Sequence, residues 1–210
     1  MNAKNSRCMS KLRYISLLCL LLCSLSLAAQ TFDDVSRRSF WQESRNVAGL
    51  RQDSLSVSFA EIYGLYESGD FRNTWDARRK WSAGASTASV LHFERMSLTG
   101  AFSFDQTEGY DMCGSMFVEP GYFPIDVLEF TPGRKTLQTY AFVGGMAYEL
   151  GSAWVLGARI DFESSNLAKR KDLRYTDWRL DLSVAPSLTY SYGNWTLGFS
   201  PVFRKVSVRF

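Results

Sequence analysis

Hydrophobic and polar residues alternate along two long stretches of this chain. Between Trp154 and Glu163 every even-numbered residue is apolar, while the odd-numbered ones become polar or charged as the run proceeds. The stretch from Trp178 to Tyr192 repeats the pattern and has aromatic residues at both ends. Side chains of a β-strand point alternately to opposite faces, so each stretch predicts a strand with one apolar and one polar face.

Strands of this kind suit a sheet with lipid on one face and water on the other. The alternation therefore predicts two sets of residues. Those expected to face lipid are Trp154, Leu156, Ile160, Phe162, Trp178, Leu180, Leu182 and Tyr190. Those expected to face a polar lumen are the charged residues Arg159, Asp161, Glu163, Arg179 and Asp181.

Weaker alternation predicts further strands, which bring the count to seven. The predicted strands are 54–66, 79–91, 96–105, 136–150, 154–163, 177–192 and one that begins at Trp195. The connections between them are alternately long (67–78, 106–135, 164–176) and short (92–95, 151–153, 193–194). Outer-membrane barrels have short periplasmic turns and long outer loops. We therefore predict an all-β, antiparallel transmembrane β-barrel or partial barrel of about seven meandering strands, with its N-terminus in the periplasm.

The first residues are typical of a secretory signal peptide. Four basic residues precede an apolar run from Tyr14 to Leu27, and small residues follow at Ala28 and Ala29. The run is too short for a spanning helix, which needs about 20 apolar residues. A lipoprotein signal at Cys23 is the alternative, but Leu22 is a poor residue for that processing. The expected organisation is a signal peptide at 1–29, a periplasmic lead-in at 30–53 with a short helix near Val35 to Trp41, and an outer-membrane barrel at 54–210.

Removing the signal changes the charge and the cysteine count. Residues 1–29 carry four basic residues and no acid, so the formal charge falls from +3 to −1 and nothing favours nucleic acid as a partner. Cys113 alone remains, which excludes an internal disulfide or a cysteine metal site. The high share of aromatic residues, 15%, favours β structure. No cofactor is expected.

The charges on the two strongest strands also predict how these strands pair. A hairpin centred on Arg170 sets Asp161 opposite Arg179 and Arg159 opposite Asp181. Opposite charges across an antiparallel pair contribute about 0.2–1 kcal/mol each. These residues either line a pore and tune its selectivity or form a self-neutralising ladder that fills a narrow lumen, and the matching signs favour the ladder.

Seven strands conflict with the even numbers of bacterial single-chain barrels. Either the chain is the N-terminal fragment of a longer barrel, or a further strand lies near Cys113 to Val118. The long loop 106–135 contains Tyr122 and Phe123, which could stack on a sugar but more readily pack within the loop. The basic run Lys169 to Lys171 could bind lipopolysaccharide, although a solvated charge run is the simpler interpretation.

Few residues point to catalysis. The single histidine, His92, falls in a predicted turn, and a turn residue is a better interpretation than a general base. The pair Gly144-Gly145 lies within a predicted strand and makes room for a close neighbour rather than cradling a phosphate. An enzyme is therefore not expected.

Three segments resemble a family of uncharacterised outer-membrane β-barrel proteins of Bacteroidota. They are Pro124–Tyr140, Leu167–Arg174 and Arg179–Pro186, and the resemblance covers about Phe40 to Phe203. It implies an outer-membrane location and a longer full-length barrel, and it implies no activity or site residue.

The function that we expect is a non-enzymatic, porin-like or structural outer-membrane barrel. Its expected partners are outer-membrane lipid and the barrel-insertion machinery. The alternatives are a surface barrel that binds a glycan, lipopolysaccharide or a protein with its outer loops, and a soluble periplasmic barrel of lipocalin type.

Overall fold

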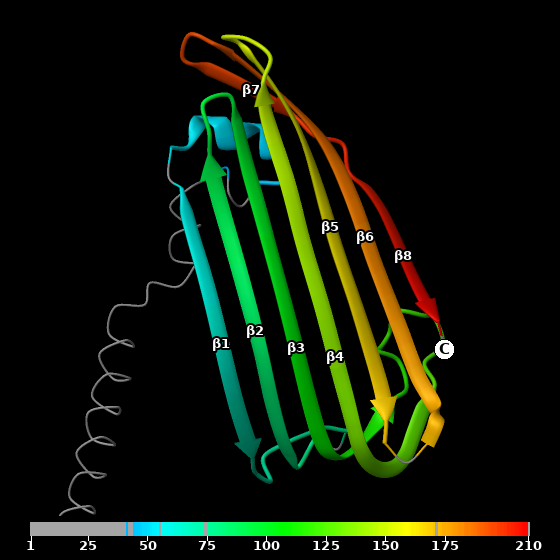
Figure 1. Cartoon of the computed structure of the whole chain (residues 1–210). Helices are drawn as coiled ribbons and strands as arrows, with labels where there is room; N and C mark the ends of the chain where they lie inside the picture. The colour runs from blue at the N-terminus through cyan, green and yellow to red at the C-terminus, as the bar shows by residue number, and fades with distance from the viewer. Residues whose placement is uncertain (1–40, 42–43, 55, 74, 171, 210) are drawn as a thin grey trace, which may run out of the picture. The chain divides into compact units, whose positions relative to one another are not determined.

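The computed structural model describes residues 41, 44–54, 56–73, 75–170 and 172–209. They form an antiparallel sheet of eight strands, preceded by a short 3-10 helix (Figure 1). The elements are η1 (Val47–Gln52), β1 (Val57–Ser68), β2 (Arg79–His92), β3 (Met96–Ser115), β4 (Leu128–Glu149), β5 (Trp154–Lys169), β6 (Asp172–Tyr192), β7 (Trp195–Phe199) and β8 (Phe203–Arg209). Neighbours in the chain pair from β1 to β7, β8 pairs with β6, and the sheet is open. The predicted all-β, antiparallel class is confirmed, whereas the predicted signal peptide and the helix near Val35 lie outside the described residues.

The predicted seventh strand is present in two pieces. Both β7 and β8 pair with β6, and they share one register, with Phe199 opposite Leu188 and Phe203 opposite Val184. Continued across the gap, this register would set Pro201 opposite Pro186. Neither proline has an N–H to donate, so the ladder breaks at this point. The eighth strand therefore lies at 203–209, and the alternative prediction of a strand near 113–118 is wrong in that 113–115 simply extends β3.

Two predicted outer loops turn out to be mostly strand. The connection between β3 and β4 is only 116–127, and β5 and β6 continue through most of 164–176. Alternation fails in this part of β3 because the ladder shifts register after Gly109 and again after Met112. Asp111 (φ 61°) and Gly114 (φ 90°) adopt the left-handed backbone there. Such bulges let a strand continue while its side-chain pattern breaks.

The predicted pairing of β5 with β6 is wrong by four residues. Asp161 lies opposite Ser183 rather than Arg179, and Arg159 lies opposite Ala185 rather than Asp181. The hairpin turns between Lys169 and Asp172, close to the assumed centre at Arg170, but the register shifts between Lys169, opposite Asp172, and Ala168, opposite Thr176, and this irregularity moves all the earlier pairs. A shift by an even number of residues leaves every side chain on its predicted face, because the faces alternate with a period of two.

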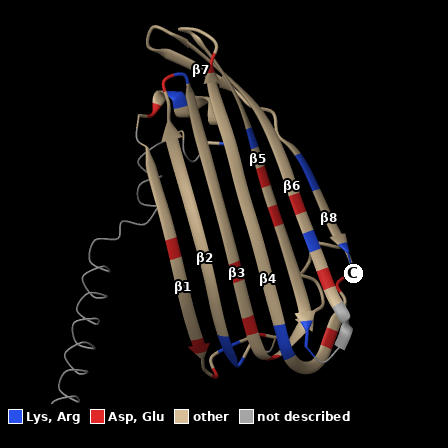
Figure 2. Cartoon of the chain, viewed as in Figure 1, with Lys and Arg blue, Asp and Glu red and all other residues tan. Residues whose placement is uncertain are grey.

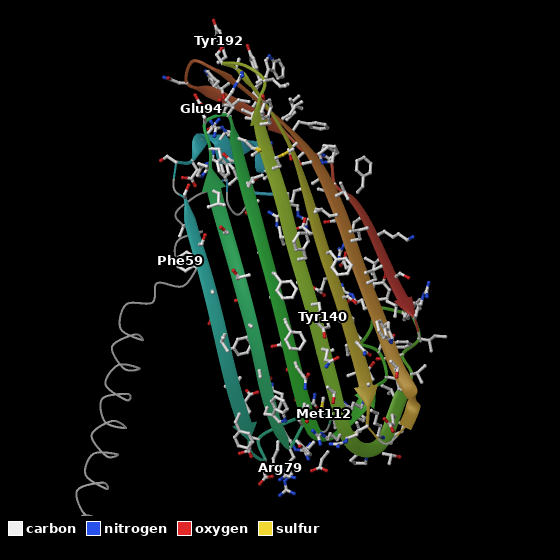
Figure 3. The ribbon with its side chains drawn as sticks, viewed as in Figure 1. Phe59, Arg79, Glu94, Met112, Tyr140 and Tyr192 are labelled. Carbon is white, nitrogen blue, oxygen red and sulfur yellow. The ribbon has the colours of Figure 1, made fainter. Side chains whose placement is uncertain are left out.

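The two faces of the sheet differ in exposure and chemistry. On the apolar face Trp154, Leu156 and Ile160 are 46%, 45% and 39% exposed. Figure 3 shows the side chains that stand along the strands, including Tyr140 midway along β4 and Tyr192 at the end of the β6–β7 hairpin. At about 3.3 Å per residue, the apolar run from Tyr140 to Tyr148 spans about 26 Å along β4. Strands β3 and β4 continue well beyond this run, as far as Ser115 and Leu128.

Three of the most deeply buried apolar residues belong to η1, which packs on the polar face. Val47, Ala48 and Leu50 are 1%, 0% and 2% exposed. Glycines in β4 and β5 make room for them, because a Cβ on Gly157 would lie 2.8 Å from Val47 Cγ1 and one on Gly145 would lie 2.9 Å from Val47 Cγ2. Gly145 and Gly157 therefore form the surface on which η1 packs, which we call the seat of η1.

Arg51 fastens the end of η1 to the turns of the sheet. Its Nε donates to Glu149 Oε1 (2.8 Å), and its Nη1 and Nη2 donate to the carbonyls of Phe93 (2.8 Å) and Glu94 (3.0 Å). Asn46, at the other end, donates to the carbonyl of Leu188 (3.4 Å). One short helix thus links the β2–β3 turn, the end of β4 and β6.

Gly157→Ala should destabilise the protein by about 1–3 kcal/mol, because the added methyl group overpacks the contact with Val47 and with the backbone of Ala48 and Met146. Gly151→Ala is the matched control, since a Cβ there meets nothing within 4 Å. Urea unfolding in detergent micelles, followed by circular dichroism, measures both. Equal stability of the two variants would contradict the assigned seat of η1.

Candidate functional site: the charged face of β5, β6 and β8

Charged side chains gather on the face of the sheet that carries η1. The five residues predicted to face a lumen all lie on this face, and the eight predicted to face lipid lie on the opposite one, as their cross-strand partners require. Figure 2 shows the charges concentrated along β5, β6 and β8, while the middle of β4 has none. We call the following set the charged cluster: Arg159, Asp161, Glu163, Arg179, Asp181 and Arg204.

The register of β5 and β6 places two carboxylates of the cluster directly opposite each other. Glu163 pairs across the strands with Asp181. Like charges in this position repel. The repulsion is offset by Arg179, whose Nη1 donates to Glu163 Oε1 (2.7 Å) and whose Nη2 donates to Asp181 Oδ2 (3.1 Å). The predicted ladder of direct cross-strand ion pairs is therefore replaced by a diagonal pair, Arg179 with Glu163, and by a pair within β6, Arg179 with Asp181.

Arg204 in β8 completes the compensation. Its Nε donates to Asp181 Oδ1 (2.8 Å), and its Nη2 reaches Asp181 Oδ2. Bidentate pairing of this kind combines charge attraction with fixed geometry. At the other end of the cluster, Arg159 Nε donates to Asp161 Oδ1 (2.9 Å), and Ser183 Oγ donates to Asp161 Oδ2 (3.2 Å). Each carboxylate of the cluster therefore has a guanidinium partner.

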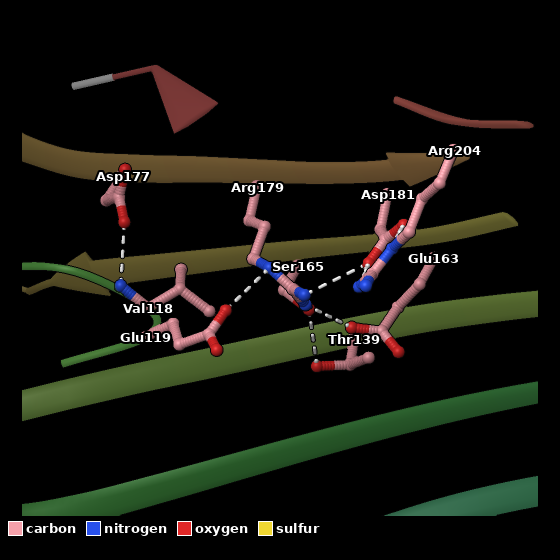
Figure 4. Close-up of polar contacts among 9 residues, drawn as sticks. All are labelled: Val118, Glu119, Thr139, Glu163, Ser165, Asp177, Arg179, Asp181 and Arg204. Atoms are coloured by element: carbon pink, nitrogen blue, oxygen red, sulfur yellow. Dashed lines mark hydrogen bonds and ion pairs between the residues drawn. The ribbon is translucent and has the colours of Figure 1, made fainter. Parts of the chain in front are cut away.

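The β3–β4 connection, 116–127, folds over the end of the cluster (Figure 4). The backbone N–H of Val118 donates to Asp177 Oδ2 (2.7 Å), and Asp177 is fully buried. Glu119 Oε2 lies 3.1 Å from Arg179 Nε. Arg179 thus joins three carboxylates from three elements. The loop is held on the polar face, so Phe123 packs against Phe117 and Tyr122 within it, as the simpler prediction had it.

A cavity of about 290 Å³ lies between the charged cluster and Arg45. It is open on one side, and Arg45, from just before η1, contributes a guanidinium to its wall together with Arg159 and Arg204. Asp161, Glu163 and Asp181 supply the opposite charge. Because the two signs balance, the cavity offers both hydrogen-bond donors and acceptors to a polar solute without a strong preference for either sign of charge.

Beyond the apolar run of β4, a second cluster of charges lies on the same face. Lys135, 3% exposed, stands opposite Lys169 across β4 and β5. Lys169 Nζ pairs with Glu129, and Lys135 Nζ donates to the carbonyl of Ser115 (3.1 Å) and lies 4.0 Å from Glu129 Oε2. Burial lowers the pKa of the Lys135 ammonium below 10.5, which Lys169 reinforces and Glu129 opposes. Lys169 therefore packs inward and is not part of an exposed basic run.

His92 is the last residue of β2 rather than part of a turn, so its predicted place was wrong by one residue. Its Nδ1 lies 2.8 Å from Ser97 Oγ. A histidine beside a serine can activate a nucleophile. Here the hydroxyl of Ser97 is fully buried and also accepts from Arg51 Nη1 (3.3 Å), so no substrate can reach it. The pair fastens the β2–β3 turn.

The alternation alone did not identify Arg45, Glu119 and Arg204 as members of this site. Arg45 and Glu119 lie outside the strands, so no periodicity marks them. Arg204 stands on a strand whose pattern is reversed, because Val206 and Val208 share its face and Lys205 lies opposite Leu182 on the apolar one. The concentration of charged residues in β8 is the sequence signal that could have identified Arg204.

Within the described part of the chain, no three His, Cys, Asp or Glu side chains gather where they could hold a metal ion. In the same residues, no helix has the length and hydropathy needed to cross a membrane.

Comparison with known proteins assigns the chain to a protein family. A family model described as a family of unknown function, DUF6850, matches residues 47–207. This match covers most of the chain, from η1 through β8, and the chain belongs to that family. No curated protein and no solved structure matches it.

Arg179→Met should cost about 2 kcal/mol of unfolding free energy, between the values typical of exposed and of buried ion pairs. The change leaves Glu163 and Asp181 opposed without their shared cation. Adding Glu163→Gln to the same chain should recover about half of the loss, because it removes one of the two charges. Urea unfolding of the three proteins measures this, and a double variant no more stable than the single one would contradict it.

Lys135→Met should alter how stability depends on pH. Because the pKa of Lys135 is lowered in the folded protein, the unfolded chain binds more protons in the window below 10.5, and the unfolding free energy of the wild type should rise with pH there. The methionine variant should lack this rise. At neutral pH its unfolding free energy should be higher than that of the wild type. The measurement is urea unfolding at a series of pH values, with the more exposed Lys80→Met as the control. A difference between variant and wild type that is independent of pH would count against it.

Proposed function

We propose that this protein is a non-enzymatic outer-membrane β-barrel protein, porin-like or structural, whose apolar face contacts lipid and whose charged face lines a polar interior. The observation that carries the proposal is the distribution of exposure. Large apolar side chains cover the exposed face of β3 to β6, whereas the opposite face holds η1 and the charged cluster. A soluble protein rarely exposes so large an apolar face.

The dimensions of the apolar face agree with this proposal. The run along β4 measures about 26 Å and the one from Trp178 to Tyr190 on β6 about 40 Å, at 3.3 Å per residue. With the tilt of about 40° found in membrane barrels, these lengths correspond to roughly 20 and 30 Å, on either side of the apolar band of about 25 Å. Trp154 and Tyr190, with ring centroids 4.5 Å apart, stand at one border of the band, where aromatic girdles occur.

The interior that we propose is not an empty pore. The cluster neutralises itself, η1 covers one end of the polar face, and the loop 116–127 covers the other. Arginine and carboxylate side chains can tune the selectivity of a pore. The pairing found here instead supports a structural role or the passage of small polar solutes.

One observation favours a second candidate function, binding at the outer surface. Strands β3 and β4 and their connection, 116–127, extend past the apolar band. In this part of the chain Ile125 and Phe130 are 79% and 71% exposed. Trp75, from the β1–β2 connection, lies beside Phe130 with ring centroids 5.9 Å apart. Exposed aromatic clusters of this kind serve protein or glycan recognition. A glycan that protects residues 116–127 from protease, in a protein without channel activity, would favour this function. A lipocalin-type soluble barrel is less favoured, because it would enclose its apolar face.

Spin labels on neighbouring residues test the membrane orientation. In a Cys113→Ser background, Ala141→Cys places the label on the charged face and Phe142→Cys places it on the apolar one. In reconstituted vesicles, the label at 142 should collide at least several-fold more often with oxygen than with a water-soluble nickel complex, and the label at 141 should show the reverse. Because residues 141 and 142 are adjacent, their labels lie at nearly the same depth in the membrane, so each label is a control for the other. A protein that stays soluble without detergent, with equal accessibilities at both positions, would refute the proposal.

A further inference from the structure

Two arginines gather around one tyrosine on the apolar side of the sheet. Arg79 and Arg134 each lie over the ring of Tyr110, with their guanidinium carbons 5.2 and 5.0 Å from its centroid. A guanidinium is attracted by the negative face of an aromatic ring. The alternation along β2, β3 and β4 places all three residues on the face of Phe104 and Tyr140, opposite the face that carries η1 and the charged cluster. Cations on this face lie outside the polar interior proposed above.

The two guanidinium groups differ in their partners. Arg134 pairs with Glu108, a buried carboxylate that also accepts a hydrogen bond from Trp81 Nε1 (3.2 Å). Arg79 is exposed, and none of the carboxylates in the described part of the chain forms an ion pair with it. Two guanidinium groups and one carboxylate leave one positive charge in excess. The donors of Arg79 are therefore open to an anion from outside the protein.

The arginines lie just beyond the apolar residues of β1 and β2. The last apolar residues on this face of the two strands are Tyr66 and Trp81, which stand directly opposite each other. Aromatic girdles mark the border of the hydrocarbon in membrane barrels. Arg79 lies two residues beyond Trp81, about 7 Å along the strand, at the end of the sheet remote from Glu94 (Figure 3). In the membrane orientation proposed above, this is the level of the lipid headgroups.

Neighbouring polar residues on the same face are uncharged. Gln138 Nε2 donates to Gln106 Oε1 (2.9 Å). Asn166 stands opposite Gln138 across β4 and β5, and its buried Oδ1 has no hydrogen-bond partner among the described residues. The amide groups of these residues include both donors and acceptors, which suit the hydroxyl groups of a sugar. A row of amides beside a pair of arginines is therefore matched to a ligand that carries both sugar and phosphate.

The longer connections of the sheet lie at the same end. They are 69–78, between β1 and β2, and 116–127, between β3 and β4. In outer-membrane barrels the longer connections face away from the cell. The lipid at this level is then a lipid of the outer leaflet, and the lipid of that leaflet which carries both sugar and phosphate is a phosphorylated glycolipid.

We propose that Arg79, Arg134 and Tyr110 bind a phosphate group of an outer-leaflet glycolipid of the lipid A type. Arg79 donates to the phosphate oxygens, because a planar guanidinium can form two parallel hydrogen bonds with them. Arg134 adds positive charge, and its pairing with Glu108 fixes it beside the ring of Tyr110. The acyl chains of the lipid lie along the apolar face. This inference rests on the proposed function, since only a sheet that spans the outer membrane meets this lipid.

Lipid binding to the purified protein in detergent tests the site. Native mass spectrometry measures the affinity for diphosphoryl lipid A, for the same lipid after removal of its phosphates, and for phosphatidylglycerol. The wild type should bind diphosphoryl lipid A about ten-fold more tightly than either of the others, the effect of one hydrogen bond to a charged group. Arg79→Gln should abolish this preference. Lys80→Gln removes a positive charge from the opposite face of the same strand, and this control should retain the preference.

A second variant does not depend on Arg79. Arg134→Gln combined with Glu108→Gln removes the other guanidinium without leaving its carboxylate unpaired, and the net charge of the site stays the same. Its affinity for diphosphoryl lipid A should fall by about ten-fold as well, because one charged donor is lost. Circular dichroism shows whether each variant is folded, and this double variant decides the test if Arg79→Gln does not fold.

Several outcomes would overturn the proposal. One is equal affinity of the wild type for lipid A with and without its phosphates, and another is an unchanged preference in a folded Arg79→Gln variant. Displacement of the lipid by millimolar inorganic phosphate would assign the arginines to a free anion. Equally tight binding of phosphatidylglycerol would assign them to anionic lipids in general. If the spin labels still report lipid and water on opposite faces, any of these failures leaves the proposed function intact.

Discussion

The hydrogen-bond register of the antiparallel ladder is the constraint on which the rest of this structure depends. Side chains alternate with a period of two, so a slip of one residue would exchange the faces and place Arg159 and Asp161 among the aromatic residues. A slip of two or four residues keeps every side chain on its face and changes only which residues lie opposite each other across the strands. The actual pairing of β5 with β6 differs from the charge-matched one by four residues, and the separation of the faces survives unchanged. Burial selects the face, while the turn together with the register shift beside it selects the partners.

The choice of partners has a consequence for the charges. The register that runs unbroken from Trp154 opposite Tyr190 to Ala168 opposite Thr176 places Glu163 opposite Asp181. Cross-strand side-chain pairs are worth only about 0.2–1 kcal/mol each, so one repulsive pair does not outweigh the backbone hydrogen bonds of this ladder. The structure accommodates the opposed carboxylates with long arginine side chains, one from β6 and one from β8. Arg179 and Arg204 can reach diagonal partners because their stems are flexible and their guanidinium groups present several donors.

How far the sequence predicts the structure depends on whether the relevant information is local. The strands with clear alternation, 154–163 and 177–192, were found with the correct ends at Trp154 and Tyr192, and so was the tight turn at Gly193, but at their other ends they continue to Lys169 and Asp172. The ends of β3 and β4 were missed because bulges at Asp111 and Gly114 break the alternation without breaking the ladder. The seat of η1 was also missed, although the small residues at 144 and 145 were noted, because nothing local connects Val47 with glycines about a hundred residues away. The candidate site was similarly half predicted, since Glu119 and Arg204 reach it through tertiary contacts alone.

The two prolines at the broken strand show how one sequence feature serves the edge of the sheet. A proline in β6 removes one donor from the ladder, which an interior strand tolerates poorly. The loss at Pro186 coincides with the gap in the last strand at Pro201, so a single interruption accommodates both residues. Ser200 Oγ then donates to the carbonyl of Pro186 (3.0 Å) and satisfies an acceptor that the ladder leaves open. The break also separates an uncharged segment, β7, from a basic one, β8, so the charge at this edge is confined to the half that lies beside the carboxylates of β6. The interruption of the ladder at the two prolines and the arginine that neutralises the charge of Asp181 therefore both lie at the same edge of the sheet, in the line formed by β7 and β8.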